Sequence, residues 1–247
     1  SGEAGIDGIV VKLYDGSGNY LASTITGDDH STAAIEYGYY QFVGLQAGSY
    51  QVEFVTPGYR LAAQDVSTTD DTRDSDADVS SGRSQVVPLA VGESNQTIDA
   101  GVYQTASLGD LLWVDTNANG KQDDGATGIS GQLITLIGGG TDGLISTVGD
   151  NTTATTTTGS DGFYQFTGLT PGVEYQVQFS KPTGYVYTGQ NLGGDDTQDS
   201  DVDTTGLSQI VTLTSGGNDP TIDAGVFARA SIGDRVWLDC DGDGVQD

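Results

Sequence analysis

The chain has 247 residues, 35% of them hydrophobic, a single cysteine and a formal net charge of −27. This apolar content excludes a disordered acidic tail, and the length allows one large all-β domain or two domains that each bury a core. The negative charge would repel nucleic acids and anionic membranes, no apolar run is long enough to cross a bilayer, and one cysteine cannot form an internal disulfide.

An internal repeat runs along the chain. Besides an acidic segment described below, four blocks of sequence recur in the same order, three of them 124 residues later and one 125 residues later. The paired blocks are GYYQFVGL (38–45) with GFYQFTGL (162–169), YQVEF (50–54) with YQVQF (175–179), SLGDLLWVD (107–115) with SIGDRVWLD (231–239), and TIDAGVY (97–103) with TIDAGVF (221–227). A period of this length indicates tandem copies of one domain.

The repeat predicts three segments in chain order. Residues 1–104 form a domain that lacks its first strand, residues 105–228 form a complete domain, and residues 229–247 carry the first strand and acidic loop of a further repeat. The chain is one residue short of two full periods. We therefore expect it to be a stretch of a longer array, with the boundary falling inside a repeat.

Each repeat is predicted to be a β-sandwich. Short segments alternate apolar and polar residues and are separated by Gly, Asp, Asn and Thr, which is typical of strands joined by turns. Helix-favouring residues are sparse, and the β-branched run at 152–158 disfavours a helix. In the complete domain, the segments expected as strands are 133–137, 163–166, 175–179, 210–213 and 222–227.

Two loops match the opening D-x-[DN]-x-[DN]-G of a calcium loop. Alternate side chains converge on one point, the glycine permits the sharp turn, and the carbonyl of the next residue adds an oxygen. An EF-hand would close with a glutamate where this chain has Ala126, so a nearby aspartate is expected to close the site. The alternative is an Asx-rich turn that binds nothing. The candidate ligands are Asp115, Asn117, Asn119, Lys121, Asp123 and Asp124 in the first loop, and Asp239, Asp241, Asp243 and Asp247 in the second.

A second acidic cluster occurs once in each repeat, as DDTRDSDAD and DDTQDSDVD. So many carboxylates within nine residues repel one another unless a cation or full solvation intervenes. A solvated acidic loop, or a halophile-type surface, is the alternative. Oxygen ligands with almost no histidine or cysteine favour Ca²⁺ over zinc or copper. The candidates are Asp70, Asp71, Asp74, Asp76 and Asp78, and their counterparts Asp195, Asp196, Asp199, Asp201 and Asp203.

The order of these motifs resembles a known family. The layouts G-D-x-x-W-x-D-x-[DN]-x-[DN]-G-x-Q-D and D-G-x-Y-x-F-x-G-L are similar to the B domains of serine–aspartate repeat (SdrD B-like) surface adhesins, within the Cna-B-type group. The match covers residues 109–227 as a full domain, 2–103 without the first strand, and 233–247 as that strand of the next copy. The resemblance implies tandem Ig-like or transthyretin-like Greek-key sandwiches, with calcium ions held in loops 115–124 and 195–203.

Catalysis is not expected. A hydrolytic nucleophile needs a base, usually histidine, and the sole histidine, His30, lies in a loop that has no counterpart in the second repeat. Some Cna-B-type domains form an internal isopeptide bond from a lysine on the first strand. This strand offers Leu111 and Leu112 in one copy, and Arg235 and Val236 in the other, so we do not expect that bond either.

Two functional hypotheses remain. The first is a calcium-stiffened stalk or filament subunit on a bacterial cell surface or in a secreted filament, in which the strand at 232–238 completes the first domain of the next copy head to tail. The second is an adhesin module that recognises a glycan or a surface protein through loops where the repeats differ most, at 28–40 and 138–158.

Overall fold

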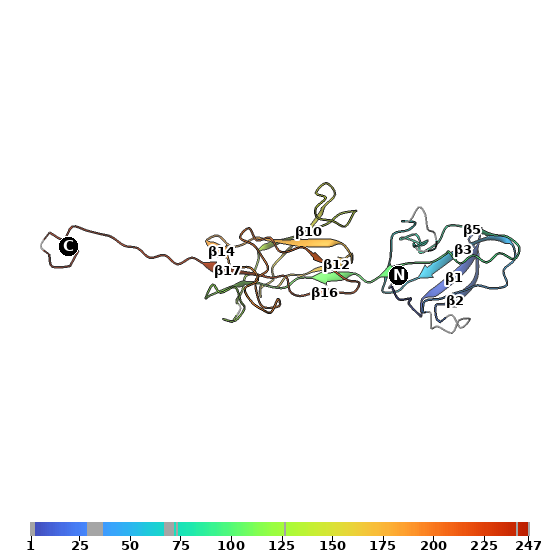
Figure 1. The fold of residues 1–247 in the computed structure, drawn as a ribbon, viewed down its shortest axis with the longest axis horizontal. Coiled ribbons are helices and arrows are strands. Elements are labelled where there is room, and N and C mark those ends of the chain that lie inside the picture. Colours follow the sequence, from blue (N-terminus) through green and yellow to red (C-terminus); the bar gives the residue numbers. More distant parts are fainter. Residues whose placement is uncertain are drawn as a thin grey trace. The chain divides into compact units, whose positions relative to one another are not determined.

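The computed structural model describes residues 3–28, 37–66, 72, 74–125, 127–240 and 242–246, and this part of the chain is built of strands and turns without a helix. In particular, no described segment forms a helix with the length and apolar character that a membrane crossing requires. The chain divides into two compact units. The first consists of Ser1–Ala106 with the short segments Gly168–Pro171 and Thr214–Gly217, and the second consists of the other residues. We describe each by itself, as sandwich 1 (strands β1–β6) and sandwich 2 (strands β7–β17) (Figure 1).

Sandwich 1 is organised around a four-stranded sheet with the order β2-β1-β3-β5, and β4 pairs separately with β6. Val11 of β1 lies opposite Phe54 of β3, and these two side chains are buried with Val52 and Ala77 in the core. The strands are β1 (Val10–Asp15), β2 (Tyr20–Ile25), β3 (Gly48–Val55), β4 (Arg60–Leu61), β5 (Val87–Leu89) and β6 (Val102–Tyr103).

Sandwich 2 has a corresponding four-stranded sheet, β11-β10-β13-β15, together with the sheets β14-β17-β8-β9 and β12-β7-β16. Its strands are β7 (Ala106–Leu108), β8 (Leu112–Val114), β9 (Thr127–Gly128), β10 (Leu133–Gly138), β11 (Thr152–Thr157), β12 (Phe166–Leu169), β13 (Glu174–Phe179), β14 (Tyr185–Tyr187), β15 (Val211–Thr212), β16 (Asn218–Asp219) and β17 (Ala224–Ala228).

The alternation of apolar residues predicted from the sequence sets which face of each strand is buried. In β10 and β13, buried and more exposed positions alternate with a period of two, as a pleated strand requires. The register pairs Ile134 with Phe179 and Leu136 with Val177, so both buried sets face the same core. The prediction of an all-β chain of tandem sandwich repeats is confirmed.

Three of the expected strands differ in position. The strand expected at 163–166 is β12 (Phe166–Leu169), and Phe163 makes an isolated bridge to Leu111 instead. The first strand expected in the complete domain is divided into β7 and β8, and the break falls at Gly109. A Cβ atom at Gly109 would lie 2.3 Å from the carbonyl oxygen of Tyr164. Residues 232–238, expected as a strand, have no strand pairing, and most of their apolar side chains are exposed.

One prediction follows from the alternation in β10. Ile134→Ala removes a side chain that is wholly buried, whereas Leu133→Ala changes a neighbour that is 49% exposed. We expect the first substitution to lower the free energy of unfolding by about 2–4 kcal/mol and the second by less than about 0.5 kcal/mol. Urea unfolding followed by Trp113 fluorescence, in a Trp237→Phe background, measures both. Equal effects would contradict the register described here.

Candidate metal centre

The two acidic segments of sandwich 2 lie against each other. The backbone N–H of Gln122 donates to the carbonyl oxygen of Gln198 at 2.8 Å, and the N–H of Ser200 donates to that of Gly120 at 3.1 Å. Lys121 and Asp199 form an isolated bridge within the same contact. Loop 115–124 and segment 195–203, which the sequence predicted as separate candidate sites, therefore form one region.

Three of the predicted ligands gather within this region. Asp196, Asp199 and Asp201 each have a carboxylate oxygen within 4.8 Å of the other two. Asp199 and Asp201 are buried, whereas Asp196 is exposed. The N–H of Gly193 donates to Asp199 Oδ2 at 2.6 Å, while Asp199 Oδ1 is buried and has no hydrogen-bond partner among the described residues.

A fourth acid, Asp223, was missed by the sequence reasoning. Its backbone N–H donates to Asp201 Oδ2 at 2.9 Å, and its Oδ2 accepts from Gln122 Nε2 at 2.9 Å. Its Oδ1 is buried and has no hydrogen-bond partner in the part of the chain that the structure describes. The signal was present in the recurring block TIDAGV, which places an acid in the same apolar stretch of both repeats.

Burial makes ionisation of these acids costly. It raises the pKa of Asp223 to about 10, with further upward contributions from the negative charges of Asp201 and Asp110. Burial likewise raises the pKa of Asp201 to about 7, although hydrogen bonds from Gln209 and from the Asp223 backbone favour the carboxylate. Burial alone raises the pKa of Asp110 to about 6. A cation at this position would favour the ionised forms.

The loop after β8 is held by hydrogen bonds to its own acidic side chains. Asp115 is wholly buried, and its Oδ2 accepts from the Gly120 N–H at 2.8 Å and from Thr188 Oγ1 at 2.5 Å. Asp124 Oδ2 accepts from two backbone N–H groups, those of Thr116 and Asn117. These contacts are of the Asx-turn kind that the sequence left open as an alternative to a calcium loop.

The side-chain amides of this loop turn toward one carboxylate. Asn117 Nδ2 and Asn119 Nδ2 donate to Asp123 at 3.1 and 2.9 Å. The Asn119 Oδ1 atom accepts from the N–H of Lys121 at 2.9 Å. Of the loop's acids, Asp124 retains a buried oxygen, Oδ1, without a hydrogen-bond partner among the described residues.

Other candidate ligands lie outside the cluster of Asp196, Asp199 and Asp201. Asp195 accepts from the N–H and Oγ1 of Thr197, and Asp203 accepts from Thr205, so both carboxylates hold turns. In sandwich 1, Asp78 accepts in the same way from Ser80 and Ser81.

Of the remaining candidates, some belong to sandwich 1 and others lie near the C-terminus. Asp76 Oδ2 accepts from the Asp99 N–H at 2.8 Å, just as Asp201 Oδ2 accepts from the Asp223 N–H. Asp74, two residues before Asp76, is half-buried. Near the C-terminus, the N–H of Gly244 donates to Asp239 Oδ2, and the N–H of Val245 donates to Asp243. Asp70, Asp71, Asp241 and Asp247 lie outside the described residues, as does His30.

The donor set fits a hard divalent cation. Ca²⁺ binds six to eight oxygen ligands from carboxylates, carbonyls and water. Asp199 and Asp223 each offer a buried carboxylate oxygen without a hydrogen-bond partner in the described chain, and Asp196 and Asp201 supply further carboxylate oxygens. No histidine or thiol belongs to the group, which suits calcium better than zinc or copper.

Sequence comparison finds related proteins over nearly the whole chain. Residues 1–102 and 106–226 match the family model described as the SdrD B-like domain. Serine-aspartate repeat-containing protein F of Staphylococcus epidermidis is 38% identical over 250 residues, covering 99% of this chain and 13% of that protein. Serine-aspartate repeat-containing protein D of Staphylococcus aureus (strain Newman) is 37% identical over 248 residues, covering 99% of this chain and 17% of that protein. The chain thus spans less than a fifth of each relative.

Structural comparison finds more distant likenesses. The Bacillus anthracis TIE protein matches with a TM-score of 0.36 at 11% identity, over 92% of this chain and 32% of that one. The minor pilin GBS52 of Streptococcus agalactiae matches with a TM-score of 0.32 at 14% identity, and the match covers 94% of this chain and 88% of that one.

The hydrogen bonds of Asp115 predict a structural role that is independent of any ion. Asp115→Ala would leave the buried Gly120 N–H and the Thr188 hydroxyl without their acceptor, so we expect the free energy of unfolding to fall by about 2–4 kcal/mol in EDTA. Asp239→Ala, at the equivalent repeat position in an exposed segment, is the matched control and should leave the Trp113 unfolding curve unchanged. The same shift in both variants would rule out this role.

Proposed function

Because the chain belongs to the SdrD B-like domain family, we propose that it is a structural extracellular module of a bacterial surface protein. In this proposal, its β-sandwich repeats form part of a stalk or filament, are stiffened by Ca²⁺, and join to neighbouring repeats head to tail by strand complementation. The role is mechanical rather than enzymatic. Relatives that carry similar sequence are serine-aspartate repeat-containing proteins, which supports a repeat-module function.

The observation that carries the calcium part of the proposal is the buried acidic cluster of sandwich 2. Two unit charges 4.8 Å apart repel by roughly 3–4 kcal/mol at an effective dielectric constant of about 20. Asp196, Asp199 and Asp201 therefore cannot all ionise cheaply without a cation, and their negative charges also disfavour ionisation of Asp223. A bound Ca²⁺ would convert this repulsion into attraction and hold segment 195–203 against Asp223, which directly precedes β17.

A stiff stalk also requires short connections between its domains. Gln104 and Thr105 alone separate β6 from β7, and neither is a glycine or a proline. Long flexible linkers are rich in glycine and serine and span large distances as random coils, whereas two residues leave little freedom. This connection supports a structural module more than a pair of independently mobile binding domains.

A second candidate function, an adhesin module for a glycan or surface protein, is favoured by one local difference between the repeats. The connection between β10 and β11 in sandwich 2 runs from residue 139 to 151, whereas β1 and β2 in sandwich 1 are joined by residues 16–19. Leu144 and Val148 of the longer loop are exposed. The N–H of Ile145 in this loop donates to Glu174 Oε2 of β13 at 2.9 Å. Binding of glycans or surface proteins that is lost when residues 140–150 are shortened would support this candidate.

Calcium should raise the thermal stability of sandwich 2. We expect its melting temperature to rise on addition of Ca²⁺ and to rise much less in Asp199→Asn/Asp201→Asn, because this variant removes two carboxylates from the cluster. Asp195→Asn is the control, since that carboxylate holds a turn outside the cluster. Scanning calorimetry and protease resistance with Ca²⁺, Mg²⁺ or EDTA measure the effect. An unchanged midpoint and unchanged proteolysis on chelation would refute calcium stiffening.

Calcium binding should release protons. The raised pKa values of Asp201, about 7, and Asp223, about 10, mean that protons compete with the ion, so affinity should increase as the pH rises from about 6 to 8. One displaced proton corresponds to about tenfold in affinity per pH unit while the acid is protonated. Titration calorimetry in buffers of different ionisation enthalpy counts the protons. A pH-independent affinity with no proton release would contradict the assignment of these acids as ligands.

A further inference from the structure

Strand β11 forms one edge of the main sheet of sandwich 2. In the described part of the chain it pairs only with β10, at the end of the strand order β11-β10-β13-β15. All six of its residues pair with β10 in one unbroken register, from Thr152 opposite Gly138 to Thr157 opposite Leu133. A regular edge strand of this kind presents a row of backbone donors and acceptors with which another strand can pair.

The hydrogen bonds of β10 show which backbone groups of β11 face outward. In an antiparallel sheet, the N–H and C=O of one residue point to the same neighbouring strand, and successive residues alternate. The N–H of Ser180 donates to the carbonyl oxygen of Leu133, so the odd-numbered residues of β10 bond to β13 and the even-numbered ones to β11. The N–H of Thr158 accordingly donates to the carbonyl oxygen of Gln132. The outward groups of β11 therefore belong to its odd-numbered residues, which are Thr153, Thr155 and Thr157.

This edge lacks the features that prevent edge strands from pairing. Natural sheets protect their edges with charged residues, prolines and β-bulges. The sequence of β11, TTATTT, contains neither a charged residue nor a proline, and its pairing with β10 has no shift of register. The three residues with outward backbone groups are all exposed.

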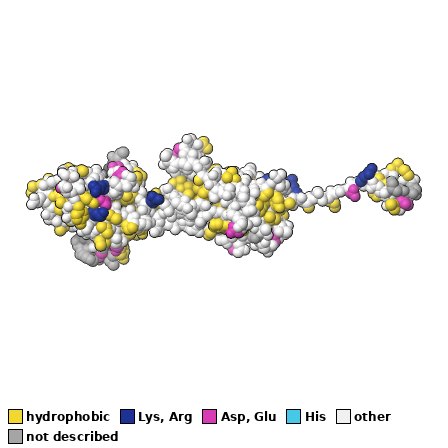
Figure 2. Space-filling model, turned by 180° about the vertical axis from the view of Figure 1, so that it is seen from behind, with side chains coloured by type: hydrophobic (Ala, Val, Ile, Leu, Met, Phe, Trp, Pro, Cys, Tyr) yellow, Lys and Arg dark blue, Asp and Glu magenta, His cyan; other side chains and the backbone are white. Residues whose placement is uncertain are grey.

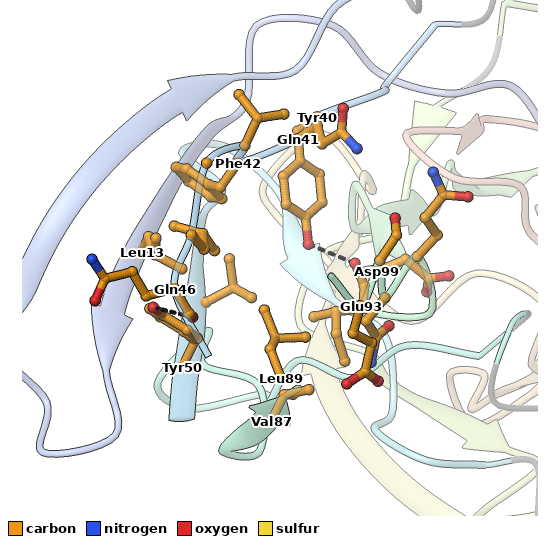
Figure 3. A pocket seen from close by; sticks show the side chains of 18 of the residues that line it. Leu13, Tyr40, Gln41, Phe42, Gln46, Tyr50, Val87, Leu89, Glu93 and Asp99 are labelled. Carbon is orange, nitrogen blue, oxygen red and sulfur yellow. Dashed lines mark hydrogen bonds between the residues drawn. The ribbon is translucent and has the colours of Figure 1, made fainter. Parts of the chain in front are cut away.

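The equivalent edge of sandwich 1, strand β2, is interrupted. The register between β1 and β2 shifts between Leu13 and Tyr14, as at a β-bulge. Leu13 lines a groove inside this sandwich together with Tyr40 (Figure 3). The ring of Tyr14 meets that of Tyr20 on β2 edge to face, with the centroids 5.9 Å apart. The bulge therefore breaks the edge of β2, whereas that of β11 is continuous.

An uncharged edge matters in a chain whose net charge is −27. Two copies of such a chain repel each other, and close approach costs least where acidic side chains are absent. Figure 2 shows acidic side chains in only a few places on one face of sandwich 2. The acids that flank β11 in the sequence turn into their own loops. Asp150 accepts from the N–H of Thr141, and Asp161 accepts from the N–H of Phe163.

We propose that β11 pairs with β11 of a second copy of this chain, antiparallel and across a two-fold axis at Thr155. Thr155 then lies opposite Thr155 of the second copy, and Thr153 lies opposite Thr157. This register pairs all the outward N–H and C=O groups of the three residues, and it places threonine opposite threonine, a favourable cross-strand pair.

The contact is a lateral one and goes beyond the head-to-tail joining proposed above. It extends the main sheet of sandwich 2 from one copy into the next. Because both copies use the same surface, the contact closes as a dimer and does not extend further. Calcium takes no part in it, so its test is independent of calcium stiffening.

Thr155→Pro tests this edge without removing a hydrogen bond of the sheet. The N–H of Thr155 points outward, and edge strands are where sheets tolerate proline. Thr155→Ala keeps the N–H and is the matched control. We expect the unmodified chain and Thr155→Ala to form dimers, and Thr155→Pro to remain monomeric. A monomeric unmodified chain, or undiminished dimers of Thr155→Pro, would overturn the proposal.

Association is measured by analytical ultracentrifugation of the full chain, over a concentration series that reaches the millimolar range. Salt at about 0.15 M screens the net charge, and reductant is included because the exposed Cys240 could form disulfide-linked dimers. Thermal melting followed by Trp113 fluorescence, in a Trp237→Phe background, checks that sandwich 2 is folded in each variant.

Two charge variants test the register. Thr153→Lys/Thr157→Glu places each lysine opposite a glutamate of the second copy, whereas Thr153→Lys/Thr157→Lys places lysines opposite each other. Two such pairs form in each dimer, so we expect the first variant to dimerise about tenfold more tightly than the second. Long-range repulsion alone predicts the reverse order, because the second variant carries less net negative charge.

The outcome of the charge variants separates the partner as well as the register. Equal dissociation constants for the two variants, or the reverse order, would show that β11 pairs with another segment or in another register, and would overturn the proposal. Raising the salt concentration should narrow the difference between the two variants and strengthen the dimer of the unmodified chain.

Discussion

The burial of carboxylates against one another is the constraint on which sandwich 2 depends. Asp201 and Asp223 are wholly buried, and Asp199 is nearly so. Gln122 and Gln209 donate hydrogen bonds to carboxylate oxygens of Asp223 and Asp201. The Oδ1 atoms of Asp199 and Asp223 have no hydrogen-bond partner in the described structure. Such a cluster is costly as bare charge, and a cation bound at it would offset that cost.

The same pair of hydrogen bonds to a buried aspartate occurs in both sandwiches. In sandwich 1, Asp76 accepts from Gln85 Nε2 and from the Asp99 N–H. In sandwich 2, Asp201 accepts from Gln209 and Asp223 in the same way.

Much of the fold could be predicted from the sequence, because alternation and repetition are local signals. The strands β10 and β13 follow from their apolar period, and the recurring blocks identify equivalent positions in both sandwiches. The break at Gly109 could not be predicted, since it depends on the close approach of the Tyr164 carbonyl. Position along the chain is a weak guide to such contacts.

The sequence predicted only part of the candidate site, because an acidic motif is a local signal and the packing of one carboxylate against another is not. Composition placed Asp199 and Asp201 among the ligands, but it could not separate them from Asp195 and Asp203, which hold turns. Asp223 was missed because its role comes from packing against Asp201, not from a local acidic run. The recurring acidic motif therefore pointed to the segment that carries the candidate cluster, and the fold determines which of its carboxylates come together.

The most direct test is a crystal structure of the full chain grown with Ca²⁺, with anomalous diffraction data. The account predicts an anomalous peak bounded by Asp196, Asp199, Asp201 and Asp223, with carboxylate oxygens at about 2.3–2.6 Å. Water in that position, with the acids hydrogen-bonded to one another as protonated carboxyls at saturating calcium, would contradict it.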